Sequence, residues 1–538
     1  MIRYNSPFQL TISEFVTPFE KELSKTNRWV VLAGILPWDR LASIYHKALC
    51  ADFGAPSIDA RIVIGALIIK HKMSLDDRGV VEMVGENPYM QYFLGLKGFK
   101  TDPIFDPSLF VTFRKRIGDK LFDEMNMEII RLAEQRGGSG KKGGSKRGNG
   151  SKTPSGADKS PVDEPAPGQE EGTKTEVPGA TLTKNKGLMM VDATVADQYI
   201  PFPTDLDLLS TSREEAERLI DVLCSALGLP EKPRTYRKVA RKAYLDIAKK
   251  KVKTKKEIRK GIRRQLQYLN RDIGHINKLL DAFDTIPFTK RDYKIWLVVQ
   301  HIYLQQKEMF DKKTNTCTHR IVNVYQPYVR PIVRGKTRNK IEFGAKLSVS
   351  LENGYARLDR LSWEAFNEGG DLIMQVEAYR GLHGHYPEVV VTDKIYGTRE
   401  NRNWLKNNGI RFCGKPLGRP PKEELSLYQK SRQRKEQRSR NQIEGKFGEG
   451  KNGFNLNRIR AKLRETSESW IATIIFVMNI NQMARASKPE PNDFWPNPVH
   501  VIHLLLSYCK NSLRQAHKMK QIVIDEYNGF AYVPAFFG

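Results

Sequence analysis

Cysteine is scarce in this sequence, with five residues in a chain of 538, and none of them forms a CxxC pair. This scarcity argues against a disulfide framework and against a cysteine-based zinc site. The N-terminal stretch MIRYNSPFQL lacks the basic, apolar and small-residue order of a secretory signal. The longest apolar run, WIATIIFVMNI, is too short to span a bilayer. We therefore expect an intracellular protein in a reducing compartment, with no membrane partner.

Apolar side chains are almost absent from residues 136–186, which are rich in glycine, serine, proline and charge. Such a segment cannot bury enough surface to fold, so we predict a flexible linker. Residues 1–135 carry apolar side chains at helical spacing, and Asp106-Pro107 is a typical helix start. We expect these residues to form a helical N-terminal domain with basic exposed faces.

Positive charge is in large excess, since 89 basic against 61 acidic residues give a net charge of +28. The excess suggests a polyanionic partner, with nucleic acid ahead of an anionic membrane. A basic surface that only keeps the protein soluble is the alternative. Residues 205–299 are predicted to be helical and very basic, with Tyr236, Tyr244 and Tyr268 among the lysines and arginines. This mixture favours a surface that tracks phosphates, while the alternative is a solvated helix face.

Two short apolar runs each lead into an aspartate. Val389–Thr392 precedes Asp393, and Leu188–Val191 precedes Asp192. Because neither run alternates with polar residues, each fits a strand that is covered on both faces. Open α/β sheets place their ligands at the ends of such strands, so each aspartate is expected to end its strand at a site. Asp393 fits equally well as the cap of a helix near residues 398–407.

The region after the linker is predicted to be a mixed α/β domain. Strand-like text covers residues 318–392, a helix is expected at 399–409, and a strand at 410–414. A polar helix and a more apolar helix follow, up to residue 484. We expect a catalytic domain formed by residues 187–204 and 300–484, interrupted by a basic helical insertion at 205–299. Residues 485–538 are predicted to be a helical C-terminal tail.

A third acid completes a candidate constellation. Two converging carboxylates repel each other, and a divalent cation is the usual compensation. In RSRNQIEGKFGEGK, residues Arg440, Glu444 and Lys451 share one helical face at about 100° per residue. The glycines that follow Glu444 weaken this helix, so Lys451 could lie past its end. The alternative is a ladder of surface ion pairs.

These features together resemble DDE-type bacterial insertion-sequence transposases. The matching text is MMVDATVADQYIPFPTDL, EVVVTDKIYGTRENRNWL and RNQIEGKFGEGKNGFNLNRIRAKL. The early segment RIVIGALIIKHKMSLDDRGVVEMVGENPYMQYFLGL is similar to the helical N-terminal domain of the same group. The resemblance implies an RNase H-like catalytic domain and a DNA-binding N-terminal domain. In related transposases a tyrosine lies three residues before the arginine, whereas this chain has Gln437 there.

The resemblance implies a site and a reaction. Asp192, Asp393 and Glu444 would be the catalytic acids that hold two Mg²⁺ ions, for which Mn²⁺ can substitute. Arg440 and Lys451 would contact DNA near these acids. The expected reaction is metal-dependent cleavage at the transposon ends, followed by transfer of the 3′-OH into target DNA. The expected partners are double-stranded DNA, with terminal inverted repeats and a target, and a second copy of the chain in a synaptic homodimer, in the bacterial cytoplasm at the nucleoid.

Two other motifs carry weaker hypotheses. GRPPK, with Arg419 and Lys422, resembles a hook that enters the minor groove of A·T-rich DNA, and the alternative is an ordinary proline-rich loop. His383-Gly384-His385 has the spacing of a metal-binding pair but lacks an evident third ligand, so we interpret it as incidental.

Three other functions stay open at this point. An RNase H-like nuclease that cuts without joining would need the same three acids. A catalytically inactive, sequence-specific DNA-binding relative fits the charge, although intact Asp192, Asp393 and Glu444 argue against it. An RNA-associated basic protein also fits the charge but not the pattern of strands and acids.

Overall fold

The computed structural model describes residues 22–50, 57–139, 184–333, 341–414 and 426–487. By its internal contacts the chain divides into two compact units, residues 1–482 and residues 483–538. The helices and strands discussed below belong to the first unit, except for residues 483–486, the last four of the final helix. Among the described helices, none combines the length and the hydropathy needed to cross a membrane.

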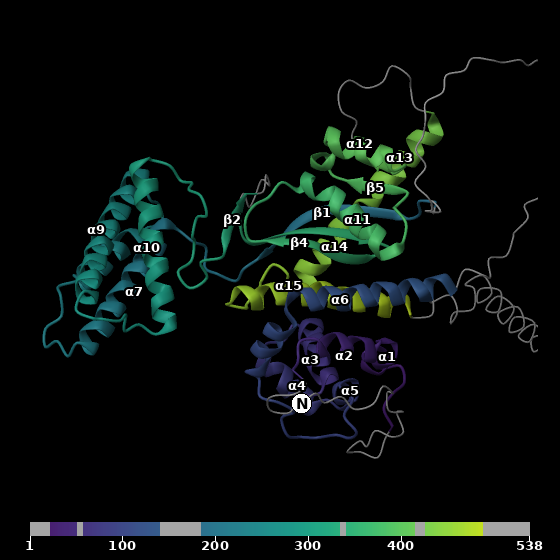
Figure 1. Ribbon diagram of the computed structural model, residues 1–538, viewed down its shortest axis with the longest axis horizontal. Coiled ribbons are helices and arrows are strands. Elements are labelled where there is room, and N and C mark those ends of the chain that lie inside the picture. The colour runs from purple at the N-terminus through teal and green to yellow at the C-terminus, as the bar shows by residue number, and fades with distance from the viewer. Residues whose placement is uncertain (1–21, 51–56, 140–183, 334–340, 415–425, 488–538) are drawn as a thin grey trace, which may run out of the picture. The chain divides into compact units, whose positions relative to one another are not determined.

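A mixed six-stranded sheet lies at the centre of the first unit (Figure 1). The order across it is β2-β3-β1-β5-β6, and β4 pairs with the same edge of β3 as β2 does, further along that strand. β1 pairs with β3 antiparallel and with β5 parallel. The predicted mixed α/β fold class is thus confirmed. The strands are β1 (Leu188–Asp197), β2 (Arg330–Val333), β3 (Ile341–Glu352), β4 (Tyr355–Ser362), β5 (Val389–Thr392) and β6 (Arg411–Cys413).

The β3–β4 hairpin turns on Asn353 and Gly354, which both have positive φ angles, 48° and 84°. An Asn-Gly pair with two positive φ angles suits a two-residue hairpin, because its twist matches that of the strands. Gly344 is required for a different reason, which is the space between two strands. A Cβ atom there would lie 1.9 Å from the carbonyl oxygen of Ala196, so only glycine lets β3 approach β1 this closely.

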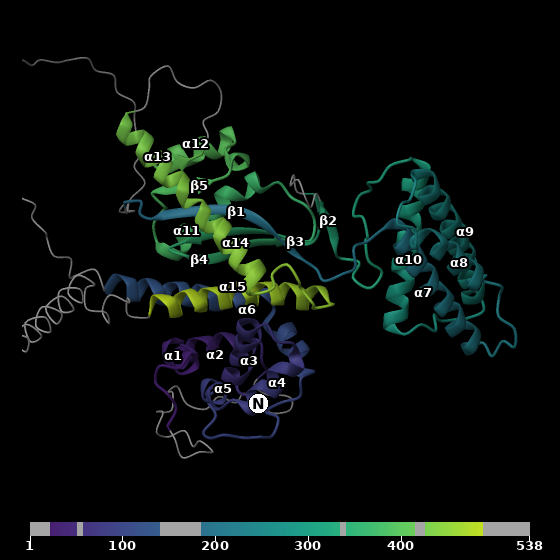
Figure 2. The same cartoon turned by 180° about the vertical axis from the view of Figure 1, so that it is seen from behind.

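Helices cover both faces of the sheet. Met189, Val191 and Val390 point to one face, where they form a buried cluster with Val376 of α11 and Leu405 of α12. Figure 2 shows α14 crossing the opposite face. These helices are α11 (Leu372–His383), α12 (Arg399–Asn407), α13 (Leu427–Ser439) and α14 (Asn441–Gly453).

Two long helices, α6 and α15, run side by side next to the sheet (Figures 1 and 2). The Phe122 and Phe476 rings pack together between them, with centroids 5.8 Å apart. Buried amides join both helices to strand β4. Asn126 Nδ2 donates to the Ala356 carbonyl at 3.0 Å, and the Ala356 N–H donates to Asn479 Oδ1 at 2.8 Å. These bonds satisfy the free side of an edge strand. The helices are α6 (Leu109–Ser139), which is broken at Gly118, and α15 (Arg464–Ala486).

The N-terminal helices pack on α15 through a buried cation. The Lys70 ammonium is 1% exposed and lies 2.8 Å from Asp77, with its nitrogen 4.6 Å from the centroid of Trp470. Arg114 also pairs with Asp77, at 2.9 Å. The predicted helical character of this region is confirmed. Its helices are α1 (Arg28–Ile35), α2 (Trp38–His46), α3 (Ala60–Met73), α4 (Asp77–Glu86) and α5 (Pro88–Phe93).

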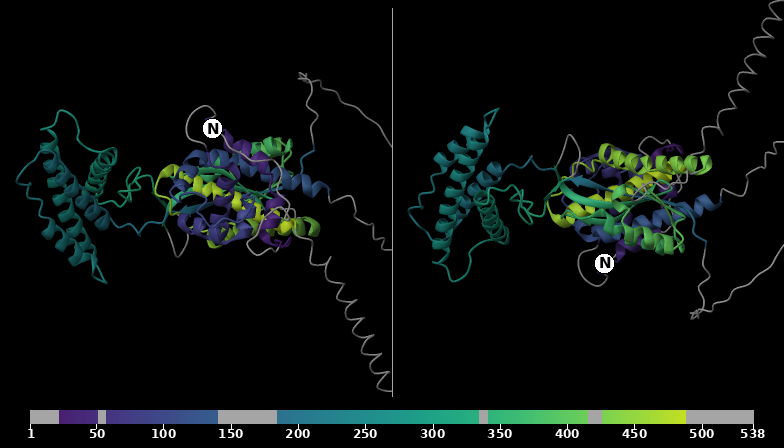
Figure 3. Two further views of the ribbon diagram at one scale, coloured as in Figure 1. Left: turned by 90° about the horizontal axis from the view of Figure 1, so that it is seen from below. Right: turned by 90° about the horizontal axis from the view of Figure 1, so that it is seen from above.

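Four helices that follow β1 form a bundle with its own core (Figures 1 and 3). The boundary predicted at residue 299 is wrong, because it divides α10. Ile295, Val299 and Ile302 of that helix are buried in the bundle core. Ile321 and Val324 belong to the same core, so the compact segment extends to Val324. The helices are α7 (Asp205–Ala226), α8 (Arg237–Ala248), α9 (Lys255–Leu280) and α10 (Lys290–Asp311).

Several other predicted boundaries shift. The stretch before β2 that resembles a strand is not one, because the Asn323 side chain accepts from the backbone N–H groups of Tyr325 and Gln326 and forms a turn. α6 continues four residues into the predicted linker, to Ser139. The rest of that linker, apart from residues 184–186, lies outside the described residues, as does the predicted tail beyond residue 487.

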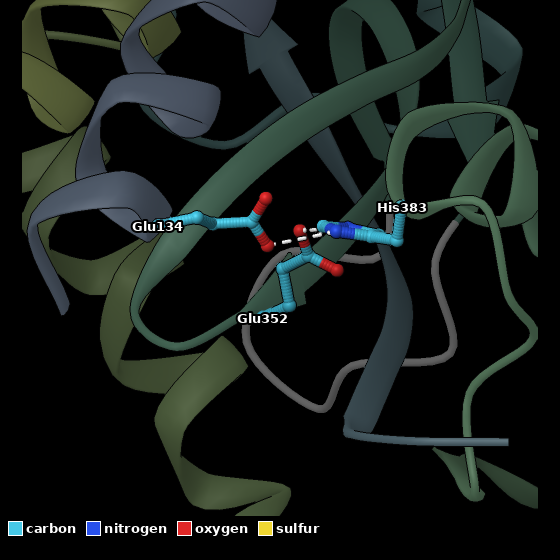
Figure 4. A group of neighbouring side chains, drawn as sticks. All are labelled: Glu134, Glu352 and His383. Carbon is cyan, nitrogen blue, oxygen red and sulfur yellow. Dashed lines mark hydrogen bonds and ion pairs between the residues drawn. The ribbon is translucent and has the colours of Figure 1, made fainter. Parts of the chain in front are cut away.

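One histidine joins three elements at the end of the sheet (Figure 4). His383 Nδ1 lies 2.7 Å from a Glu134 oxygen on α6, and its Nε2 lies 2.6 Å from a Glu352 oxygen on β3. Both ring nitrogens can donate only when the imidazole is protonated. Burial lowers the pKa of His383, but the hydrogen bond and the charges of the two glutamates outweigh it, so the pKa is raised.

We predict that His383→Gln lowers stability by about 1–3 kcal/mol at pH 6, because it removes two charge-assisted hydrogen bonds from a buried site. The raised pKa gives the sign of the pH dependence. The contribution is complete below the usual histidine pKa and is lost as pH rises through the higher folded value. Melting temperatures of the two proteins from pH 5.5 to pH 9 should therefore converge. His301→Gln, at an exposed histidine on α10, is the control. A difference in melting temperature that does not change with pH would contradict the raised pKa of His383.

The bundle core contains a carboxyl group whose burial also makes stability fall as pH rises. Asp272 is fully buried, and burial together with the charge of Glu217 raises its pKa to about 8. Its folded form stays protonated while the unfolded chain ionises, so stability falls as pH rises from about 4 to about 8. We predict that Asp272→Asn melts a few degrees, ~3 °C, above wild type at pH 8.5. The two proteins should differ little at pH 4.5. A lower melting temperature for the variant at pH 8.5 would contradict this.

Candidate active site

The register of two strands brings Asp192 and Asp393 together. Val191 of β1 lies opposite Thr392 of β5, and both aspartates follow directly in a parallel pair. The prediction that Asp192 ends its strand is wrong. β1 continues to Asp197, because β3 pairs with it along this whole stretch, while β5 stops at Thr392. Asp192 therefore lies in mid-strand, at the level where its neighbour ends.

The Asp393 side chain also caps a turn. It accepts the N–H of Lys394 at 2.7 Å at the start of a short 3₁₀ helix, Lys394–Tyr396. The cap of α12 is Thr398, whose side chain accepts from Asn401 N–H at 3.2 Å. The helix expected near residues 398–407 is thus confirmed, and its cap is not Asp393.

The third acid comes from α14. Arg440 lies at the joint between α13 and α14, and Glu444 is in the first turn of α14. Ile443 beside it is fully buried, so it anchors this turn against the rest of the domain. The Glu444 side chain is 54% exposed and the Asp393 side chain 51%, whereas that of Asp192 is only 14% exposed. The three acids thus form a site that is closed behind Asp192 and open to solvent on the other side.

One guanidinium nitrogen contacts all three acids. Arg440 Nη2 lies 3.2 Å from Glu444 Oε1, 3.6 Å from Asp192 Oδ2 and 3.7 Å from Asp393 Oδ2. The carboxylates therefore surround a cation instead of contacting one another. The predicted proximity of Arg440 to Glu444 on one helical face is confirmed, and Arg440 carries the positive charge that compensates the site in this structure.

Asp192 is the electrostatically strained member of the group. Burial raises its pKa, and the charges of Glu368 and Asp393 raise it further. A hydrogen bond from the Ala193 N–H, at 2.8 Å, and the charge of Arg440 act in the opposite direction without cancelling the shift. The site therefore holds more negative charge than Arg440 alone offsets, so an additional cation would stabilise the ionised form.

Lys451 lies on the same helix but away from the acids. α14 extends to Gly453, so the expectation that Lys451 lies past its end is wrong. Tertiary packing overrides the weak helix propensity, because Gly450 lets α14 approach Leu456 and Met478 closely. Lys451 is about 16 Å along the helix from Arg440, and its ammonium lies 3.5 Å from Glu342 on β3.

Sequence reasoning missed a fourth acid. Glu368 begins a short 3₁₀ helix, Glu368–Asp371, and its charge acts on both Asp192 and the buried Tyr396. Lys346 of β3 pairs with it at 2.8 Å. The sequence around Glu368 contains no motif. The position of Glu368 next to Asp192 depends on how the chain packs after β4. No sequence signal could have identified it.

The remaining predicted residues give two different outcomes. Arg419 and Lys422 lie outside the described residues. His383 belongs to the group Glu134, Glu352 and His383, whose ligand atoms lie close enough together to hold a metal ion (Figure 4). Because both of its ring nitrogens already contact carboxylates, these three side chains are explained as an ion-paired clamp.

The triad has the chemistry of a site for hard cations. The three acids offer carboxylate oxygens as ligands. Among the described residues, no cysteine or histidine belongs to this group around Arg440. Oxygen-only sites suit Mg²⁺ and Mn²⁺. Its open side gives room for a large anionic substrate.

Comparison with known proteins gives two domain matches. Residues 390–481 match a family described as transposase DDE domain, and this stretch includes Asp393, Arg440, Glu444 and Lys451. Residues 17–116 match a family described as transposase domain. No solved structure matches the chain.

A curated relative is an uncharacterized protein, ORF8 in the nfe locus of Rhizobium meliloti. It is 34% identical over 108 residues, which are 20% of this chain and about half, 52%, of the relative. The two domain matches lie on either side of the bundle and agree with the resemblance seen in the sequence. The matched stretches, a transposase DDE domain and a transposase domain, support an insertion-sequence DDE transposase.

Proposed function

We propose that this protein cleaves DNA at the ends of its element and joins the resulting 3′-OH to target DNA. The observation that carries the proposal is the convergence of Asp192, Asp393 and Glu444 on one cation. Carboxylates are held together in this way when a site binds divalent metal ions, through which it can act on a polyanion. The matched DDE domain favours DNA as the polyanion.

The catalytic domain is proposed to be RNase H-like. Support comes from the mixed sheet, in which the first two acids lie on neighbouring parallel strands and the third on a helix that crosses the sheet. With the boundary corrected, this domain comprises residues 187–204 and 325–486. Residues 1–139 are proposed to bind DNA, in keeping with their match to a transposase domain.

Asp192, Asp393 and Glu444 would hold the metal ions. Two divalent ions, when bound, would activate the attacking oxygen and stabilise the leaving oxygen of a phosphodiester. Asp192 is oriented by the Ala193 N–H and Asp393 by the Lys394 N–H, so both carboxylates are fixed before substrate arrives. Mg²⁺ is proposed as the natural ion, and Mn²⁺ as a substitute.

Arg440 has a second role in this proposal. Its guanidinium compensates the acids when no other cation is present, and it would turn to a DNA phosphate once the acids are otherwise neutralised. Guanidinium groups suit both partners, because carboxylate and phosphate accept the same paired N–H geometry. Lys451 is proposed to contact the DNA backbone further along α14. Since two ends must be joined to one target, a synaptic homodimer is the proposed assembly.

We predict that Asp393→Asn and Glu444→Gln each reduce Mg²⁺-dependent cleavage of DNA carrying the element's own end by at least about 100-fold. Binding of that DNA should change little, because both substitutions keep the shape of the side chain. Glu400→Gln, an exposed acid on α12, is the matched control and should cut normally.

Transfer of the cut strand to a target plasmid is measured in the same reactions. Cutting without transfer would replace the proposal by a nuclease function. Binding by wild type without cutting, in Mg²⁺ and in Mn²⁺, would identify a DNA-binding relative and would refute the proposed role of the acids.

We further predict that Arg440→Gln tightens Mn²⁺ binding to the DNA-free protein, by roughly tenfold, because the ion no longer competes with a guanidinium. Cleavage should fall in the same variant. Titration of Mn²⁺ followed by electron paramagnetic resonance measures the affinity. Arg438→Gln, an exposed arginine two residues away on α13, is the control and should leave both unchanged. Weaker Mn²⁺ binding to Arg440→Gln would show that Arg440 does not compete with the ion.

A further inference from the structure

Helix α9 presents a basic outer face. Lys256, Lys260 and Arg263 recur at helical spacing on one side, all exposed, and Gln267 and Asn270 continue that side by another two turns. The opposite side of α9 faces the bundle. There Gly261 packs on Ile247 of α8, and the Gln265 side chain donates to a backbone carbonyl of α8. The basic face is therefore directed away from α8.

A groove of about 800 Å³ runs along this face. Its other wall is α10, which contributes Tyr303, Lys307 and Phe310. Arg259 links the two walls, because its guanidinium lies 4.1 Å from the centroid of the Phe310 ring and donates to the Phe310 carbonyl at 3.0 Å. The groove thus has a fixed floor, with exposed ammonium and guanidinium groups along its rim.

Several acids of the bundle pair with cations outside this basic face or at its edge. Asp221 pairs with Arg237 at 2.7 Å, and Asp292 pairs with Arg218 at 2.7 Å. Along the groove, Lys307 pairs with Asp311 at 2.5 Å. For the remaining cations of the rim, Lys256, Lys260 and Arg263, the described part of the chain contains no acidic group within ion-pair distance.

These unpaired cations repel one another, and a bound polyanion would relieve that repulsion. Lys256, Lys260 and Arg263 follow one another along about 10 Å of α9, at 1.5 Å per residue. They do not converge on one point. A single small anion would leave most of them unpaired. The arrangement fits a repeating chain of phosphates.

We propose that the α9–α10 groove of the bundle binds the phosphate backbone of duplex DNA. The assignment of DNA instead of another polyanion rests on the proposed function. The groove would hold flanking or target DNA without regard to sequence, because its rim consists of charges that meet phosphates and not base edges. It is a binding surface in addition to the triad, and none of its residues takes part in the chemistry.

The test uses the full chain and a short mixed-sequence DNA duplex, without divalent metal. The variant Lys256→Gln/Lys260→Gln/Arg263→Gln removes three rim charges. The control Lys238→Gln/Arg241→Gln/Lys242→Gln removes two lysines and one arginine from the exposed surface of α8. A third variant, Lys256→Arg/Lys260→Arg/Arg263→Lys, keeps the charge of the rim. Fluorescence anisotropy gives Kd over a range of KCl concentrations, and circular dichroism checks that each variant is folded.

We expect that the groove variant alone releases fewer counterions than wild type when it binds the duplex. The slope of log K against log salt should become shallower by about 2–3, since each lost phosphate contact removes about 0.9. Kd at low salt should rise at least about tenfold, and the charge-keeping variant should behave like wild type. Equal slopes for the groove variant and the α8 control would overturn the proposal, as would stronger competition by structured RNA than by the duplex.

Cleavage assays separate the failure of this inference from the failure of the proposed function. If wild type cuts DNA carrying the element's end while the groove variant keeps the wild-type salt slope, only the groove assignment is wrong. If wild type neither binds the duplex nor cuts, both are wrong.

Discussion

The contact of one guanidinium with three carboxylates requires that the surrounding α/β domain be rigid. Three like charges come within 3.7 Å of a single nitrogen, so each must be held by a rigid element. The β1–β5 register holds two of them, and α14 holds the third. α14 is fixed in turn by its close approach to Met478 of α15, and buried amides tie α15 to α6 and to the edge of the sheet. A continuous set of packed contacts therefore connects the N-terminal helices to the site.

Local patterns were enough to predict the parts of this site. The uninterrupted run Val389–Thr392 is a fully buried strand, and the Asp393 that follows it is at the site. The i, i+4 spacing of Arg440 and Glu444 gave their shared face correctly, because that geometry belongs to a single helix. The basic insertion and the helical N-terminal region were also evident from composition and periodicity, though the end predicted for the insertion, residue 299, falls inside α10.

Features that depend on partners could not be predicted in the same way. Asp192 lies in mid-strand because β3 pairs beyond the point where β5 stops, and a strand's own residues do not encode the length of its neighbours. Lys451 remains helical because α14 packs tightly at a glycine that on its own would weaken a helix. Glu368 reaches the site from a loop, and its contribution depends on a charge acting through space on Asp192. Each of these outcomes is decided by tertiary contacts.

The way in which the bundle is attached to the sheet affects how such a chain can evolve. Asp197, where β1 ends, and Arg330, where β2 begins, both pair with the same residue, Gly344. The chain therefore leaves and re-enters the sheet two strand spacings apart, about 10 Å, at one level. Such closely spaced ends let a whole domain be gained, lost or exchanged without moving the strands that carry the acids. Related chains could therefore exchange the bundle while the positions of Asp192 and Asp393 stay constant.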